Sequence, residues 1–269
     1  KPFEFIEFGK IAIPLIIICI ISVLIVIKLL IKKLKISTRM AYLISIGSTV
    51  CGTTAIMATA PVIKANKNEV SYAIANITLF GILSMLLYPY FANLYFDGNS
   101  LFAGLFLGTA IHETSQVAAA GLIYDQQFDS PETLNVATVT KLIRNTFLIV
   151  MIPLFAFLYN RGSVREKNYS IINIFPFFVL GFIAMIILRN LGDEVFSTYK
   201  NDIWIEIIDY IKFFSKIFLT MAMGAIGLST NLKDIKIMGY KPFIVGFIAM
   251  LTVGIMCILT IEIYLKLFI

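Results

Sequence analysis

The sequence predicts an all-α membrane protein, a polytopic bundle of helices, and three observations support this class. Of the 269 residues, 59% are hydrophobic and the mean hydropathy is +0.91, whereas soluble domains are about 45–50% apolar. Apolar runs of about 20 residues, the length that crosses a bilayer, recur from one end of the chain to the other. Short polar stretches separate these runs, and none is long enough for a separate soluble domain.

We expect about eight membrane spans in this chain. Basic residues gather in the loops after the first, fifth and seventh spans, so these loops are expected on the cytoplasmic side of the membrane. The expected spans are 9–31, 41–65, 70–92, 100–124, 133–159, 171–190, 213–231 and 240–268.

Two of these spans, 41–65 and 213–231, are expected to be broken helices. Both turn small, hydroxylated and glycine-containing at their centres, and Pro61 closes the first. Such a weak helix centre survives in hydrocarbon only where it lines a cavity or packs on protein. In many secondary transporters, half-helices of this kind meet at the membrane midplane and form the substrate site. The alternative is that the small residues serve close helix packing.

Interrupted segments at corresponding places in two halves are typical of an inverted repeat of two crossing helices. We therefore expect residues 1–95 to form a partial first repeat, with the broken helix 41–65. Residues 96–269 are expected to form a second repeat of five spans, with the broken helix 213–231. Two further spans are then expected upstream of Lys1.

Ionisable and amide side chains gather inside two spans that are expected to be unbroken. An ionisable residue inside the membrane costs about 2.5–3.5 kcal/mol or more and is a functional candidate by default. Helical spacing puts each group on one face of its span. Similar depths make a Glu113–Arg144 ion pair geometrically possible, and the alternative to a functional site is that this pair, with Lys141, only holds two helices together. The first group is Thr109, His112, Glu113 and Gln116, and the second is Thr138, Lys141, Arg144 and Asn145.

A small anion is the ligand that these groups favour. Glu113 offsets only one of the two cations, Lys141 and Arg144, and an unpaired buried cation is costly. The N-terminal ends of half-helices also attract anions, and neither break contains Asp or Glu. The expected binding residues are Cys51, Gly52, Thr53, Thr54, His112, Glu113, Gln116, Lys141, Arg144, Asn145, Ser229, Thr230 and Asn231.

Four segments in the same order resemble the signatures of the YeiH-type sulfate exporter family. They cover nearly the whole chain, although Thr53 and Thr54 stand where the family often has small residues or Ser, and Glu113 where it often has Asp. The segments are Cys51–Ala65 (CGTTAI and APVIKA), Ile111–Gly121 (IHETSQVAAAG), Lys141–Asn145 (KLIRN) and Gly227–Leu232 (GLSTNL).

The resemblance implies an inverted-repeat fold of about ten spans, related to sodium/proton antiporters and bile-acid symporters. It also implies secondary active transport of a small inorganic oxyanion, sulfate or sulfite export, across a bacterial cytoplasmic membrane. The expected partners are the anion, the lipid bilayer, a coupling proton or sodium ion and a second copy in a homodimer. No cofactor, metal or nucleic acid is expected, and protonation of His112 would link transport to the proton gradient.

Other functions stay open beside this one. The segment His112–Gln116 is one residue from the zinc motif HExxH, but His112 is the only histidine in the chain. A hydrolase built on Ser115 and His112 lacks a nucleophile-elbow sequence, so we expect no enzyme. The remaining alternatives are a sodium- or proton-coupled organic anion symporter, a passive channel and a cation exchanger.

Overall fold

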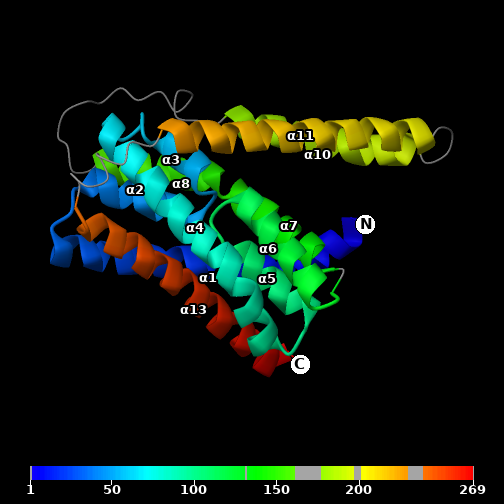
Figure 1. Ribbon diagram of the computed structural model, residues 1–269, viewed down its shortest axis with the longest axis horizontal. Helices are drawn as coiled ribbons and strands as arrows, with labels where there is room; N and C mark the ends of the chain where they lie inside the picture. The colour runs from blue at the N-terminus through cyan, green and yellow to red at the C-terminus, as the bar shows by residue number, and fades with distance from the viewer. Residues whose placement is uncertain (1, 131, 161–176, 197–200, 230–238, 269) are drawn as a thin grey trace. The chain divides into compact units, whose positions relative to one another are not determined.

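Helices make up all the regular secondary structure of residues 2–130, 132–160, 177–196, 201–229 and 239–268, which the computed structural model describes (Figure 1). The predicted all-α class is therefore confirmed. The helices are α1 (Pro2–Leu34), α2 (Thr38–Thr49), α3 (Thr53–Thr59), α4 (Lys67–Phe96), α5 (Ser100–Ala110), α6 (Thr114–Gln127), α7 (Thr133–Thr146), α8 (Leu148–Asn160), α10 (Phe177–Phe196), α11 (Asn201–Ser229) and α13 (Lys241–Phe268).

The chain divides into two compact units. The first unit combines Lys1–Ile174 with Leu232–Ile269 and holds α1 to α8 together with α13. The second unit, Phe175–Asn231, holds α10 and α11.

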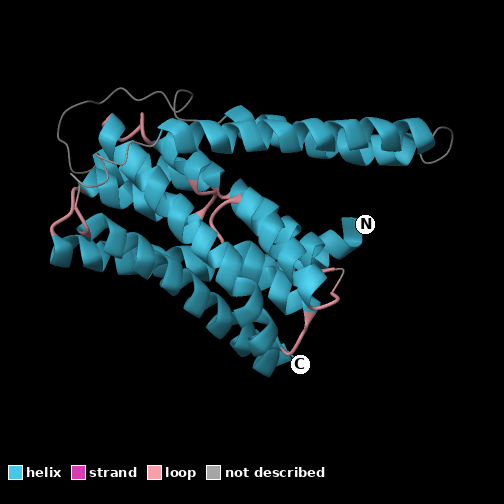
Figure 2. Ribbon diagram, in the orientation of Figure 1, coloured by secondary structure: helices cyan, strands magenta, loops and turns pink. Residues whose placement is uncertain are grey.

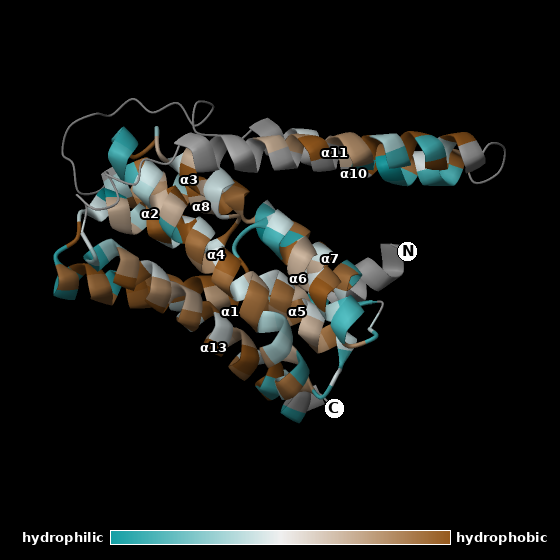
Figure 3. Cartoon of the chain, viewed as in Figure 1, coloured by the Kyte–Doolittle hydropathy of each residue, from teal (hydrophilic) through white to brown (hydrophobic). Residues whose placement is uncertain are grey.

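The first unit carries helices that are suited to a bilayer. Among the described residues, four helical segments are long and apolar enough to cross a membrane: Gly9–Leu34, Lys67–Phe96, Thr133–Tyr159 and Lys241–Tyr264. The last of these segments is part of α13. Both α13 and α1 are mostly hydrophobic (brown in Figure 3). Exposed apolar side chains recur every four residues on one face of α1 and of α13, as expected for faces that contact lipid acyl chains. They are Ile13, Ile17, Ile21, Ile25 and Leu29 on α1, and Phe243, Phe247, Leu251, Ile255, Leu259 and Ile263 on α13.

Two interrupted helices lie inside this unit. The first is the pair α2 and α3, and the second is the pair α5 and α6; short loops break the helices within the bundle (Figure 2). Helix α7 packs on both α5 and α6, while α4 packs on α2, α3, α5, α6 and α13. Helix α1 packs on α13 and α2. The breaks are therefore enclosed by α4, α7 and the other helices of the first unit.

Glycines let α5 approach α7 closely. A Cβ atom at Gly108 would lie 2.4 Å from the carbonyl oxygen of Ala137, and one at Gly104 would lie 2.5 Å from Val136. The two glycines are four residues apart, the spacing at which small residues form a close helix–helix seam in membranes. This seam holds α7, and hence Lys141 and Arg144, against the broken helix.

Polar caps fix the ends of several helices in the first unit. The Asn66 side chain accepts from the Glu69 backbone N–H at 2.8 Å, and Glu69 accepts in return from the Asn66 N–H at 3.1 Å, which completes a capping box at the start of α4. Ser37, the N-cap of α2, donates to the same Glu69 carboxylate at 2.8 Å. The starts of α2 and α4 are therefore tied together.

In the second unit, α11 differs from the expectation. The structure has a single helix from Asn201 to Ser229 in place of the predicted break in 213–231, so that expectation is wrong over the described residues. A glycine costs a helix roughly 1 kcal/mol, but intrahelical hydrogen bonds satisfy the backbone in hydrocarbon. The small residues of this segment are thus compatible with a continuous helix, and the division of the chain into repeats 1–95 and 96–269 stays a prediction.

We expect Gly108→Ala to lower the free energy of unfolding by about 1–3 kcal/mol, because the new methyl group overpacks the seam with α7. Gly181→Ala is the matched control, since a Cβ there meets no atom within 4 Å in the part of the chain that the structure describes. The control should be neutral or slightly stabilising, because alanine is the better helix former. Thermal unfolding followed by circular dichroism measures both, and equal stability of the two variants would contradict the close packing.

Candidate functional site

The first break confirms the prediction of a discontinuous helix within 41–65, and the structure places it around Cys51 and Gly52. Helix α2 ends at Thr49, and α3 begins at Thr53. Gly52 has φ +60°, and a Cβ atom there would lie 2.6 Å from the Cγ atom of Glu113. Glycine is required here on both counts, because the left-handed backbone and the close approach each disfavour a side chain.

The second break lies in a span that was expected to be continuous. Helix α5 ends at Ala110 and α6 begins at Thr114, with Ile111 and Glu113 in extended conformations between them. The expectation of one unbroken helix over 100–124 is therefore wrong. The run His112–Gln116 holds five consecutive polar residues, which a single helix would distribute around its whole circumference. This run was the sequence signal for the break.

The two breaks contact one another. The Glu113 carboxylate, from the second break, accepts hydrogen bonds from the Thr53 hydroxyl and from the Thr53 N–H, the latter at 3.4 Å. Thr78 on α4 also donates to this carboxylate, at 3.5 Å. Glu113 thus lies at the start of α3, and no side chain of the first break caps this helix.

Lys141 on α7 also connects the two breaks, through hydrogen bonds to backbone carbonyl groups of each. Its ammonium donates to the carbonyl oxygens of Val50 at 2.8 Å and Ile111 at 2.9 Å, and also to that of His112. The side chain is fully buried. One of these carbonyl groups belongs to the first break and two belong to the second.

Arg144, one helical turn further along α7, makes the same kind of bridge. Its guanidinium donates to the carbonyl oxygens of Thr49 at 2.8 Å and Ile111 at 3.0 Å. It also donates to the carbonyl oxygens of Ser48 and Thr109. The last turns of α2 and α5 therefore find their hydrogen-bond donors on α7, since carbonyl groups at a helix C-terminus have no partner within the helix.

The Glu113–Arg144 ion pair that the sequence made possible is not formed between these two described residues. The Arg144 donors point to backbone carbonyl oxygens, whereas the Glu113 carboxylate accepts from threonines. The ends of α2 and α5 carry partial negative charge, which a count of charged side chains does not include. Lys141 and Arg144 are neutralised in part by these helix ends.

Three more of the predicted residues, His112, Gln116 and Asn145, lie beside the crossing, the place where the two breaks meet. His112 is fully buried, and within the described part of the chain neither of its ring nitrogens has a hydrogen-bond partner. The Gln116 amide donates to the Thr78 carbonyl oxygen at 3.2 Å, and the Asn145 amide donates to the Thr114 hydroxyl at 3.3 Å.

Cys51 and Gly52 are buried in the first break, and Thr54 is exposed. Ser229 closes α11 in the second unit. Thr230 and Asn231 lie outside the described residues.

The start of α6 is a feature that the sequence reasoning missed. Among the described residues, no side chain caps this 14-residue helix, so its first N–H groups lack a side-chain partner. Thr114 and Ser115 in this first turn are half-buried, as is Asn145 beside them. In the continuous helix expected over 100–124, intrahelical hydrogen bonds would have occupied the N–H groups of Thr114 and Ser115.

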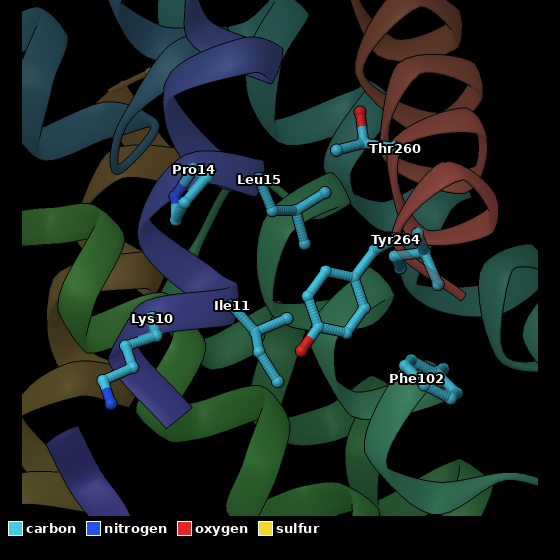
Figure 4. A pocket seen from close by; sticks show the side chains of 8 residues that line it. Lys10, Ile11, Pro14, Leu15, Phe102, Thr260 and Tyr264 are labelled. Carbon is cyan, nitrogen blue, oxygen red and sulfur yellow. The ribbon is translucent and has the colours of Figure 1, made fainter. Parts of the chain in front are cut away.

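A groove of about 310 Å³ lies elsewhere in the first unit, between α1, α5 and α13. Figure 4 shows Ile11, Leu15 and Tyr264 facing one another there, with Lys10 at its edge. Phe102 lines it at the start of α5, about 14 Å along the helix from the second break. The groove contains none of the predicted binding residues.

Sequence comparison places the chain among known proteins. A family model described as conserved hypothetical protein 698 matches residues 2–246. A UPF0324 membrane protein of Fusobacterium nucleatum is 37% identical over 266 residues, which cover 94% of this chain and 76% of that protein. The chain belongs to the UPF0324 family of membrane proteins.

Two streptococcal relatives of this UPF0324 protein have the same family name. One from Streptococcus agalactiae is 37% identical over 239 residues, which cover 88% of this chain and 69% of that protein. One from Streptococcus pyogenes is 38% identical over 244 residues, which cover 89% of this chain and 69% of that protein. No solved structure matches the UPF0324 chain.

In the UPF0324 protein, Arg144→Leu should lower the free energy of unfolding by about 3 kcal/mol or more, because it leaves buried carbonyl groups of both breaks without donors. Arg189→Leu is the control, since Arg189 makes an exposed ion pair with Asp193 at 2.9 Å. Such a surface pair contributes about 0–1 kcal/mol. Thermal unfolding of the purified proteins tests the difference, and a tolerated Arg144→Leu would contradict the bridging role.

Proposed function

We propose that this UPF0324 protein is a secondary active transporter that moves a small inorganic oxyanion, such as sulfate or sulfite, across the bacterial cytoplasmic membrane. The observation that carries the proposal is the uncapped start of α6 beside the crossing that holds Lys141 and Arg144. Free N–H groups at the start of a helix are a ready anion site. The hydroxyl groups of Thr114 and Ser115 and the Asn145 amide would supply further donors.

The local charge supports an anion over a cation. With about −0.5 charge at each C-terminal end and +0.5 at each N-terminal end, the four half-helix ends of the crossing cancel. Lys141 and Arg144 together with an ionised Glu113 then leave about one positive charge. A small anion would balance this charge in a medium where an unbalanced one is costly.

A carrier accounts for the crossing better than a passive channel. Half-helices that meet inside a membrane bundle are typical of secondary transporters, whose site opens alternately to either side. The Lys141 and His112 side chains at the crossing are fully buried, so an anion reaches them only if helices move. An open pore would instead expose such groups to water.

Sulfate or sulfite is the preferred substrate because of the YeiH-type motifs in the sequence, and an organic anion is the main competitor. Cys51–Ala65 and Ile111–Gly121, which carry two of these motifs, contain both breaks. The residues of the proposed function are therefore those that carry the resemblance. The coupling ion and a homodimer are part of the same proposal.

Counterflow of radiolabelled sulfate into liposomes that contain the purified protein tests this function. Uptake should saturate with sulfate concentration, and unlabelled sulfite should compete better than small carboxylates. Competition by carboxylates alone would favour an organic anion symporter, and uptake that does not saturate would favour a channel. Absence of any sulfate- or sulfite-dependent signal would overturn the oxyanion assignment.

Ser115→Ala should raise the sulfate concentration for half-maximal counterflow about tenfold, since one hydrogen bond to a charged ligand contributes about 1.5–3 kcal/mol. Thr252→Ala is the matched control, because the Thr252 hydroxyl donates within α13, to the Ile248 carbonyl oxygen at 2.7 Å. The control should leave the half-saturating concentration unchanged. Equal effects of the two substitutions would argue against an anion at the start of α6.

A further inference from the structure

The carbonyl groups at the crossing form a cage of the kind that binds cations. Six backbone carbonyl oxygens, three from each break, converge on the side chains of Lys141 and Arg144. The C-terminal ends of half-helices carry partial negative charge. In transporters built on broken helices, such unwound carbonyl groups coordinate the coupling sodium ion or proton.

The number of donors matches the number of acceptors around Lys141. Its nitrogen lies 2.8 Å from the Val50 oxygen and 2.9 Å from the Ile111 oxygen, and it also donates to the His112 oxygen. Three acceptors require three N–H bonds, which the ammonium form has and a neutral amine lacks. Because the side chain is fully buried as well, these three oxygens have no free position for an additional cation.

We propose that the Lys141 ammonium is a tethered cation that occupies the place of a coupling sodium ion, while Arg144 keeps the two breaks together. Removal of the Lys141 side chain would then open a latent site for a monovalent cation among the Val50, Ile111 and His112 oxygens. A second consequence, which rests on the proposed function, is that transport does not depend on sodium. Coupling would come from the proton gradient or from exchange of anions.

The decisive experiment is a cation titration of the full chain in nanodiscs, with chloride salts of sodium, potassium, ammonium and N-methyl-D-glucamine. The melting temperature of the wild type should be the same in all four salts. Lys141→Ala should melt lower in N-methyl-D-glucamine and regain roughly 2–4 °C, saturably, with sodium, potassium or ammonium. N-methyl-D-glucamine is too large for the cage and sets the baseline.

Lys141→Met is the matched control, because its apolar side chain fills the same space and lacks a charge. It should melt lower than the wild type and show no saturable gain with any of the four salts. Lys10→Ala, at an exposed position on α1, should behave like the wild type throughout. A gain in Lys141→Ala that Lys141→Met shares equally, or no gain in either, would overturn the proposal.

The wild type alone keeps the proposal testable if neither variant folds. Saturable stabilisation of the wild type by sodium over potassium and N-methyl-D-glucamine would show that the sodium site is intact, and would overturn the tethered-cation role. Sulfate counterflow with all sodium replaced tests the consequence for transport, and loss of uptake would contradict it. A protein that never transports sulfate would refute the proposed function, while the cation titration would still decide the role of Lys141.

Discussion

Carbonyl groups that lose their helical partners inside a bilayer need other donors, and this constraint governs the rest of the structure. Each break leaves the last carbonyl groups of a half-helix, α2 or α5, buried within the bundle. Lys141 and Arg144 supply the donors to both sets of carbonyl groups from a single helix, α7. The breaks, the crossing and the buried positive charge are therefore parts of one arrangement. Loss of either cation would leave carbonyl groups of both breaks without hydrogen-bond donors.

The same arrangement leaves one helix end at the crossing without a side-chain cap. The C-terminal ends of α2 and α5 are satisfied by cations, and the start of α3 by Glu113. The start of α6 has no side-chain cap, and its first turn is only half-buried. Under the proposed function, a small oxyanion would bind at this remaining end, where the helix N-terminus supplies positive charge and hydrogen-bond donors.

The sequence predicted the membrane bundle and a break within 41–65, because hydropathy and a glycine-containing centre are local signals. It also singled out His112, Glu113, Lys141 and Arg144, since ionisable residues are rare inside a membrane. It did not predict the roles of Lys141 and Arg144, because backbone carbonyl acceptors from α2 and α5 become neighbours only in the fold. The small residues of 213–231 suit a break and a packing helix equally, and the structure has the helix.

Disulfide crosslinking between the two breaks tests the central claim most directly. In a chain whose three native cysteines, Cys19, Cys51 and Cys257, are replaced by alanine, Thr53→Cys with Glu113→Cys should crosslink on mild oxidation, since these side chains are in contact. Thr53→Cys with Gln127→Cys should not, because Gln127 lies about 20 Å away along α6. A crosslink in the first pair alone is the predicted result. Absence of that crosslink, or equal crosslinking of both pairs, would contradict the crossing.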